Sequence, residues 1–204
     1  MTMTYKSHLQ LFFHPTNFSI VRASKASMAP TNAPISLTYT AASQPTTSLR
    51  FFLQLLRASL QALPQHSTPV PALLNLISSG WDTALAVAEA ERQLNLETPT
   101  CARILSDERL LVEAEILLRD VKTKVRVGYQ VSAAVAAGQD DNDNLALSVN
   151  VEPEVKVVYG EPYNETKMQE FVKKNIGGEV EGWDAVVRQL RTRLIARGAK
   201  GAKV

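Results

Sequence analysis

The sequence predicts an α+β protein built from two related domains, each a small antiparallel sheet covered by helices on one face. Three observations carry this prediction. The chain has 204 residues with 45% hydrophobic content, enough for one ordinary domain or two small ones. Apolar residues alternate in some segments, as in strands, and recur every three or four positions in others, as in helices. The same order of elements also occurs twice, which is typical of a duplicated module.

The first half is expected to contain strands followed by helices. In order, these elements are a strand over residues 4–13, a strand over 35–39, a helix over 49–63 and a helix from 70 that continues to about 96. Residues 44–48 supply turn and helix-capping chemistry before the first helix. Pro64 ends that helix, because proline lacks a backbone N–H and cannot continue the hydrogen-bonded ladder.

The second half begins near residue 98 and is expected to open with a hairpin. Strands over residues 110–118 and 121–131 are separated by Arg119-Asp120 alone, which predicts a two-residue turn.

This turn sets a register on the solvent face of the hairpin. It places Glu113 opposite Arg126 and Glu115 opposite Lys124, so that opposite charges pair across the strands. An alternative interpretation makes the basic residues of the second strand an anion site. The matching of signs favours the hairpin.

A further strand and two helices are expected to complete the second half. The strand runs over residues 145–151 and continues, or gives way to a fourth strand, over 155–159. Pro153 interrupts it and belongs at a sheet edge or a bulge, because proline lacks the ladder donor. Asn164 caps the next helix, and the last helix begins near Gly182 with an apolar face that includes Ile195.

The internal repeat sets the predicted domain boundaries, 1–98 and 99–204. Each copy has a strand that ends in tyrosine, a turn, an apolar helix, a break and a Gly-Trp-Asp helix start. Residues 35–39 and 80–82 of the first copy match residues 155–159 and 182–184 of the second copy, respectively. Tyr39, Trp81 and Trp183 are therefore expected to have structural roles in packing. The first copy has fewer strands and no leading helix, so it is expected to be truncated at its start.

The sequence contains no recognisable catalytic, metal or cofactor motif. Cys101 is the only cysteine, which excludes an intrachain disulfide and a cysteine-built zinc site. The three histidines lack metal-ligand spacing, and no phosphate loop or nucleophile elbow is present. We therefore predict a non-enzymatic protein without a cofactor, a metal or a small-molecule substrate.

Bulk properties argue against two other classes of partner. A formal net charge of +2 is too small for binding by phosphate neutralisation, so no direct nucleic-acid contact is expected. No stretch approaches the roughly 20 apolar residues of a membrane span. No acidic residue precedes Asp82, which leaves an organellar transit peptide as an alternative, although the apolar residues near the N-terminus favour a strand.

Because the sequence contains no catalytic motif, we expect the protein to function through surfaces that bind other molecules. A partner peptide can add a strand at a sheet edge or occupy a groove. The last helix is basic at its end, which is typical of a solvated helix terminus and also of a contact with an acidic partner. The predicted partner-binding residues are Val155, Val157, Tyr159, Arg188 and Arg191.

Five segments together resemble a known family. They are residues 4–13, 36–39, 50–61, 78–82 and 158–164, and they are similar, in order, to the C-terminal region of the fungal outer-kinetochore scaffold protein of the blinkin type. The resemblance implies tandem RWD domains without catalysis or a cofactor. It also implies docking onto subunits of the MIND complex through a short peptide segment, at the kinetochore of the centromere in the nucleus.

In that family, such docking supports kinetochore assembly, attachment to spindle microtubules and chromosome segregation. The chain lacks the family's disordered arm with spindle-checkpoint motifs and its coiled coil, so a fragment or a truncated gene model is expected. Two alternatives remain: an RWD-type adaptor outside the kinetochore, and an α+β enzyme of unknown chemistry.

Overall fold

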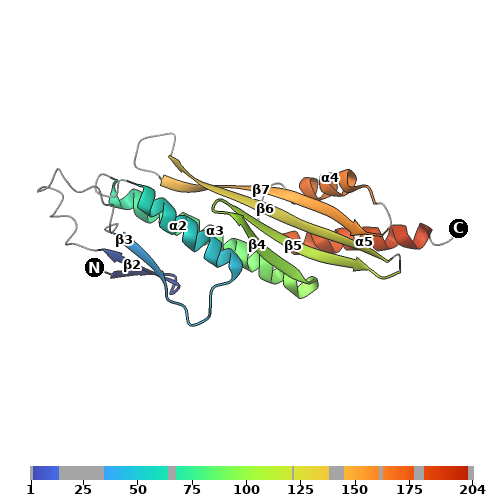
Figure 1. Cartoon of the computed structure of the whole chain (residues 1–204), viewed down its shortest axis with the longest axis horizontal. Helices are drawn as coiled ribbons and strands as arrows, with labels where there is room; N and C mark the ends of the chain where they lie inside the picture. The colour runs from blue at the N-terminus through green and yellow to red at the C-terminus, as the bar shows by residue number, and fades with distance from the viewer. Residues whose placement is uncertain are drawn as a thin grey trace, which may run out of the picture. The chain divides into compact units, whose positions relative to one another are not determined.

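The computed structural model describes residues 2–13, 35–63, 68–120, 122–137, 145–160, 163–176 and 182–201. These residues form an α+β structure with one three-stranded and one four-stranded antiparallel sheet and four helices (Figure 1). The predicted fold class is confirmed. The described chain divides into a first unit, 1–84 with 134–148, and a second unit, 85–133 with 149–204. The domain boundary at residue 98 stays a prediction.

The elements follow the chain in this order. They are β1 (Thr2–Tyr5), β2 (Leu9–Phe13), β3 (Ile35–Tyr39), α2 (Thr47–Ala62), α3 (Val70–Glu97), β4 (Thr100–Ser106), β5 (Arg109–Leu118), β6 (Thr123–Ala137), β7 (Leu145–Tyr159), α4 (Glu165–Ile176) and α5 (Trp183–Gly201). The first sheet has the order β1-β2-β3 and the second has the order β4-β5-β6-β7.

The first unit opens with a hairpin, so the single strand expected over residues 4–13 is wrong. Lys6 and Ser7 have φ angles of 45° and 57° and turn the chain between β1 and β2. Two successive positive φ values match the twist of flanking strands in a tight hairpin. Neither residue is glycine or asparagine, so the usual sequence signal for this turn is missing.

The predicted strand at 35–39 and the first predicted helix are confirmed as β3 and α2. The Thr46 hydroxyl accepts a hydrogen bond of 3.3 Å from the Leu49 N–H, which caps α2 as the sequence indicates. The Arg57 side chain donates to the Leu37 carbonyl at 2.9 Å and fastens α2 to β3. Burial of the apolar face of α2 supplies the core of this unit.

Helix α3 runs without a break through Gly80, so the predicted helix start at residues 80–82 is wrong for the first copy. A Cβ at Gly80 would lie 2.7 Å from a methyl of Leu56, so glycine here allows α2 and α3 to approach closely. Glycine costs only about 1 kcal/mol inside a helix, which the close packing offsets. In the second copy, Trp183 does begin a helix, α5.

Both tryptophans are buried against a tyrosine within their own unit. The ring centres of Trp81 and Tyr39 in β3 are 6.1 Å apart. Those of Trp183 and Tyr129 in β6 are 4.6 Å apart. Both indoles are almost fully excluded from solvent. The tyrosine that the repeat matches to Tyr39 is Tyr159, which is half-exposed, so the two copies do not share the same tryptophan partner.

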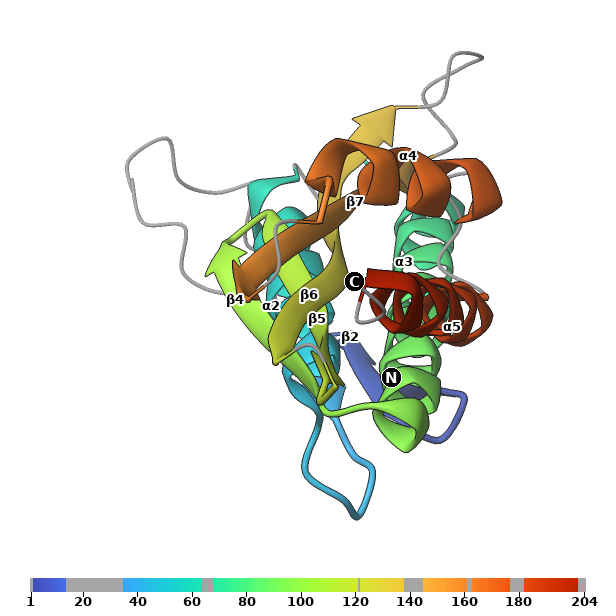
Figure 2. The same cartoon turned by 90° about the vertical axis from the view of Figure 1, so that its right-hand side faces the viewer.

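The four-stranded sheet begins with β4, a strand that the sequence analysis did not predict. Its residues are mostly exposed, and adjacent Ile104 and Leu105 break the alternation of apolar and polar positions. Strand β7 is continuous through Pro153, so the predicted interruption is wrong. The strand forms the opposite border of the sheet, which confirms the predicted edge position of this proline. Figure 2 shows α5 alongside this sheet, with α4 beside it.

The hairpin of β5 and β6 exists, but its predicted register is wrong by two residues. Glu115 lies opposite Arg126, and Glu113 lies opposite Gly128. Leu118 pairs with Thr123, so the connection is longer than the predicted two-residue turn, and Lys122 takes a positive φ of 46°. A shift of two keeps each side chain on the same face of the sheet, so the apolar pattern cannot distinguish the two registers.

The acidic residues of β5 find different partners from those expected. Glu113 pairs with Arg103 of β4, whereas Glu115 pairs with Lys124 at 2.6 Å and Arg126 at 3.1 Å. The hydrogen bond from Lys124, aided by Arg126, lowers the pKa of Glu115 below its usual value of 4.5. The predicted pair of Glu115 with Lys124 thus forms as a diagonal contact, and the pair of Glu113 with Arg126 does not form.

We expect Glu115→Gln to lower the free energy of unfolding by about 1 kcal/mol at neutral pH, since two partly exposed pairs contribute about 0.2–1 kcal/mol each. Because the pKa of Glu115 is lower in the folded state, its ion pairs stabilise the protein at pH values above the unfolded pKa. This stabilisation is lost as the pH falls through the folded pKa. The difference between wild type and variant should therefore shrink below pH 4.5. Urea unfolding at neutral and acid pH measures it, and an undiminished difference in acid contradicts the assignment.

Candidate protein-docking groove

A groove of about 630 Å³ lies at one end of the second unit. It is bordered by the end of α3, the start of β4, the turn between β5 and β6, the end of β7 and the second half of α5. Its lining residues are Glu97, Thr98, Pro99, Glu115, Ile116, Leu117, Leu118, Arg119, Asp120, Lys124, Tyr159, Arg191 and Ile195. We call this surface the end groove.

Hydrogen bonds around Thr98 hold one side of the end groove in place. The Thr98 N–H donates to the Leu94 carbonyl at 2.9 Å and closes the last turn of α3. The Thr98 hydroxyl donates to the carbonyl of Glu115, whose own N–H donates to the Pro99 carbonyl at 2.9 Å. The junction of α3 and β4 is therefore bonded directly to β5, so this part of the groove is preformed.

Three half-exposed apolar side chains line the end groove. Leu117, Tyr159 and Ile195 have exposed fractions of 50%, 51% and 47%. Ile195 was expected on the buried face of the last helix, and that prediction is wrong. Ile116 and Leu118, which also line the groove, are buried. Exposed apolar groups next to a cavity are typical of sites that bind another protein or a ligand.

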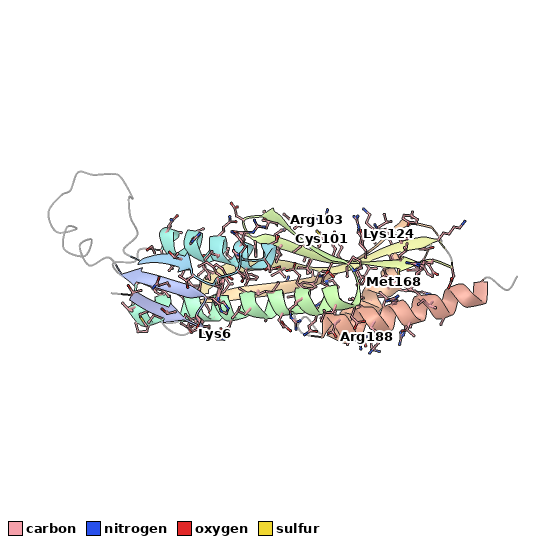
Figure 3. All side chains as sticks on the ribbon, turned by 90° about the horizontal axis from the view of Figure 1, so that it is seen from below. Lys6, Cys101, Arg103, Lys124, Met168 and Arg188 are labelled. Atoms are coloured by element: carbon pink, nitrogen blue, oxygen red, sulfur yellow. The ribbon has the colours of Figure 1, made fainter. Side chains whose placement is uncertain are left out.

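The charges of the end groove are partly paired. Glu97 forms an ion pair with Arg188, with 2.6 Å between the carboxylate oxygen and the guanidinium nitrogen. Glu115 forms ion pairs with Lys124 and Arg126. Figure 3 shows Lys124 on the sheet and Arg188 on α5, the two elements that flank the groove. Among the described residues, no ion pair is formed by the side chains of Arg119 and Arg191, both of which are exposed.

The structure brings together some of the predicted partner-binding residues and separates others. Tyr159 and Arg191 both line the end groove, and Arg188 reaches it through Glu97. Val155 is 7% exposed, so its side chain belongs to the core. Val157 is partly buried, and its backbone N–H donates to Glu165 at 2.6 Å. Of the predicted partner-binding residues, Tyr159 and Arg191 therefore lie together at one surface.

The outer edge of β7 is covered by two side chains of α4. Glu165 accepts from the Val157 N–H, and the Gln169 amide donates to the Pro153 carbonyl at 3.1 Å. Pro153 itself has no N–H to offer, so residues 153–157 present few free backbone groups for strand addition. The Pro153 edge that the sequence suggested as a docking site is thus already occupied. At the other border, β4, the Thr100 N–H donates to the Asn95 side chain at 3.2 Å.

Sequence reasoning missed Leu117, Arg119 and Ile195. Leu117 was recognisable as an apolar residue on the polar face of an alternating strand, which is an exposed position. Arg119 was placed in a turn without a role. Ile195 fits the apolar spacing of its helix, so no signal in the sequence separates it from the core residues beside it.

Metal sites and membrane-spanning helices are absent from the described residues. Within those ranges, no group of three or more His, Cys, Asp or Glu side chains is placed to hold a metal ion. None of the helices in the described ranges is long and apolar enough to cross a membrane.

Comparison with known proteins places part of the chain beside a described family. Residues 1–88 match the family model described as Knl1 RWD C-terminal domain. This segment contains the three-stranded sheet, α2 and most of α3, so the end groove lies outside the matched residues. No curated protein and no solved structure matches the chain. The resemblance inferred from the sequence is confirmed for these residues.

Proposed function

We propose that the chain is a kinetochore scaffold module that docks onto the MIND complex, because residues 1–88 match the family model of the Knl1 RWD C-terminal domain. The docking is non-enzymatic and engages a short segment of a MIND subunit. Its consequences are those of a kinetochore scaffold in the nucleus: kinetochore assembly, attachment of centromeres to spindle microtubules and chromosome segregation.

The end groove is the observation that supports docking through a short segment. Its volume of about 630 Å³ is in the range of sites that bury most of a small ligand or a few side chains of a peptide. Tyr159 and Ile195 are half-exposed on its walls, and a tyrosine at such a position is a common energetic centre of protein interfaces. The covered edge of β7 supports a groove rather than strand addition at that border as the docking mode.

Co-elution of the chain with purified MIND complex at micromolar concentration tests this proposal. We expect the wild-type chain to shift into the complex peak, and Tyr159→Ala or Ile195→Ala to weaken the affinity about 5- to 30-fold, equivalent to about 1–2 kcal/mol.

Leu96→Ala is the matched control, since Leu96 is an exposed leucine near the end of α3 that does not line the groove. A folded wild-type chain that fails to co-elute with MIND counts against the proposed function. Equal losses for Leu96→Ala and Ile195→Ala count against the end groove as its site.

A further inference from the structure

We propose that the end groove selects an acidic peptide segment that carries an apolar anchor, and that Arg119 and Arg191 pair with its carboxylates. This inference deepens the proposed function and rests on it for the identity of the partner, because the groove is the same surface.

Internal ion pairs leave the end groove with unpaired positive charge. Glu97 is neutralised by Arg188, and Glu115 is shared between two basic side chains of β6. Two exposed arginines, Arg119 and Arg191, line the groove without an ion pair among the described residues. The acidic residue that remains is Asp120, next to Arg119 in the turn. The free charge that the groove offers an incoming chain is therefore mainly positive.

Arginine side chains suit the recognition of carboxylates. A guanidinium is planar and holds a carboxylate through two parallel hydrogen bonds. Arg119 lies in the turn of the β5-β6 hairpin and Arg191 lies on α5, so the two cations belong to different walls of the groove. A segment lying between these walls can meet both cations through acidic residues on either side of its anchor.

The same groove also presents apolar surface. Leu117, Tyr159 and Ile195 are about half-exposed, and each gains from removal of its remaining apolar area from water. One inserted aliphatic or aromatic side chain contacts this surface best, because a groove of this size holds few side chains. Apolar contact gives affinity and the flanking charges give selectivity and a faster association rate.

Nucleic acid fits the same surface less well. Phosphate recognition depends on several simultaneous basic contacts along a backbone, whereas the groove offers two unpaired arginines and also lines its wall with Asp120 and two paired glutamates. An acidic peptide satisfies both the cations and the apolar surface.

The test uses three short fluorescent peptides of equal length with the same central leucine, and measures binding to the full chain by anisotropy. One carries aspartates on both sides of the leucine, one carries asparagines there, and one carries lysines. We expect the aspartate peptide to bind about tenfold more tightly than the asparagine peptide, and the lysine peptide to bind least. The preference for aspartate should shrink at high salt, because exposed charges are screened.

Matched charge reversals assign the effect to the groove. Arg191→Glu should weaken aspartate-peptide binding about tenfold and remove the preference over asparagine, whereas Lys174→Glu should leave both unchanged. Lys174 is an exposed residue of α4 that does not line the groove. Circular dichroism of each variant shows that the change lies in binding and not in folding.

Three outcomes overturn the inference: equal binding of the aspartate and asparagine peptides, tighter binding of the lysine peptide, and displacement of the aspartate peptide by a short single-stranded oligonucleotide. Failure of this inference is separable from failure of the proposed function. If Arg191→Glu binds MIND as tightly as wild type does, the acidic-segment inference alone is wrong. If the chain binds the aspartate peptide selectively but does not co-elute with MIND, only the proposed kinetochore partner is wrong.

Discussion

Trp183→Ala should lower the free energy of unfolding by about 3–5 kcal/mol, the largest stability effect that we expect from one substitution in this chain. The indole is 1% exposed and packs 4.6 Å from the Tyr129 ring, where α5 begins against β6. Its removal leaves a cavity and also deprives α5 of its first contact with the sheet. Urea unfolding followed by circular dichroism measures the loss.

Two controls make this result specific to packing. Trp183→Phe keeps an aromatic ring beside Tyr129 and should recover more than half of the loss. Leu96→Ala changes an exposed side chain and should stay within about 0.5 kcal/mol of wild type. A loss below about 1 kcal/mol for Trp183→Ala would show that this contact does not hold α5 in place.

Gly160→Ala should cost about 2–4 kcal/mol, the second-largest effect expected. Gly160 has a φ of 102°, a conformation that side chains disfavour by about 1–3 kcal/mol. A Cβ there would also lie 2.6 Å from the Lys122 carbonyl oxygen, which belongs to the backbone and cannot rotate away. The resulting clash adds about 1–3 kcal/mol.

Gly182→Ala separates these two causes. Gly182 also has a positive φ, 82°, but a Cβ there meets nothing within 4 Å. Its cost should therefore be about 1 kcal/mol, from backbone conformation alone. Comparing the two variants by denaturant midpoint isolates the clash at Gly160. Equal costs at both positions would mean that the backbone of the β5-β6 turn moves aside.

Much of the fold could be predicted because burial imposes a period on the sequence. The apolar spacing of α2 and its Thr46 cap were sufficient to place that helix, and Asn164 marks the start of α4 through its hydrogen bond to the Lys167 N–H. Strand β3 is delimited in the same way by its alternation. In each case the local signal agrees with the tertiary environment.

The failures have equally physical causes. The register of β5 and β6 was wrong by two because side-chain facing repeats every two residues, so Glu115 can face Lys124 or Arg126 without changing the core. The hairpin at Lys6 was missed because residues other than glycine and asparagine adopt its positive φ values. Strand β4 was missed because an exposed border strand needs little apolar alternation.

The end groove was predictable only in part, for a related reason. Tyr159 and Arg191 were chosen from a strand end and a basic helix, and the structure places both at one surface. Arg119 and Leu117 join them through the turn of the β5-β6 hairpin, whose length depends on the register that the sequence left open. Which acidic residues are already neutralised, such as Glu97 by Arg188, depends on contacts between residues far apart in the chain.

The α4 side chains that cover the outer edge of β7 also limit how the four-stranded sheet can polymerise. A sheet with two open borders can stack head to tail without end, because each added copy leaves a new border for the next. Glu165 and Gln169 occupy the backbone N–H of Val157 and the carbonyl of Pro153, so a further strand adds less readily to this part of β7. These two side chains therefore disfavour end-to-end growth of the sheet through residues 153–157.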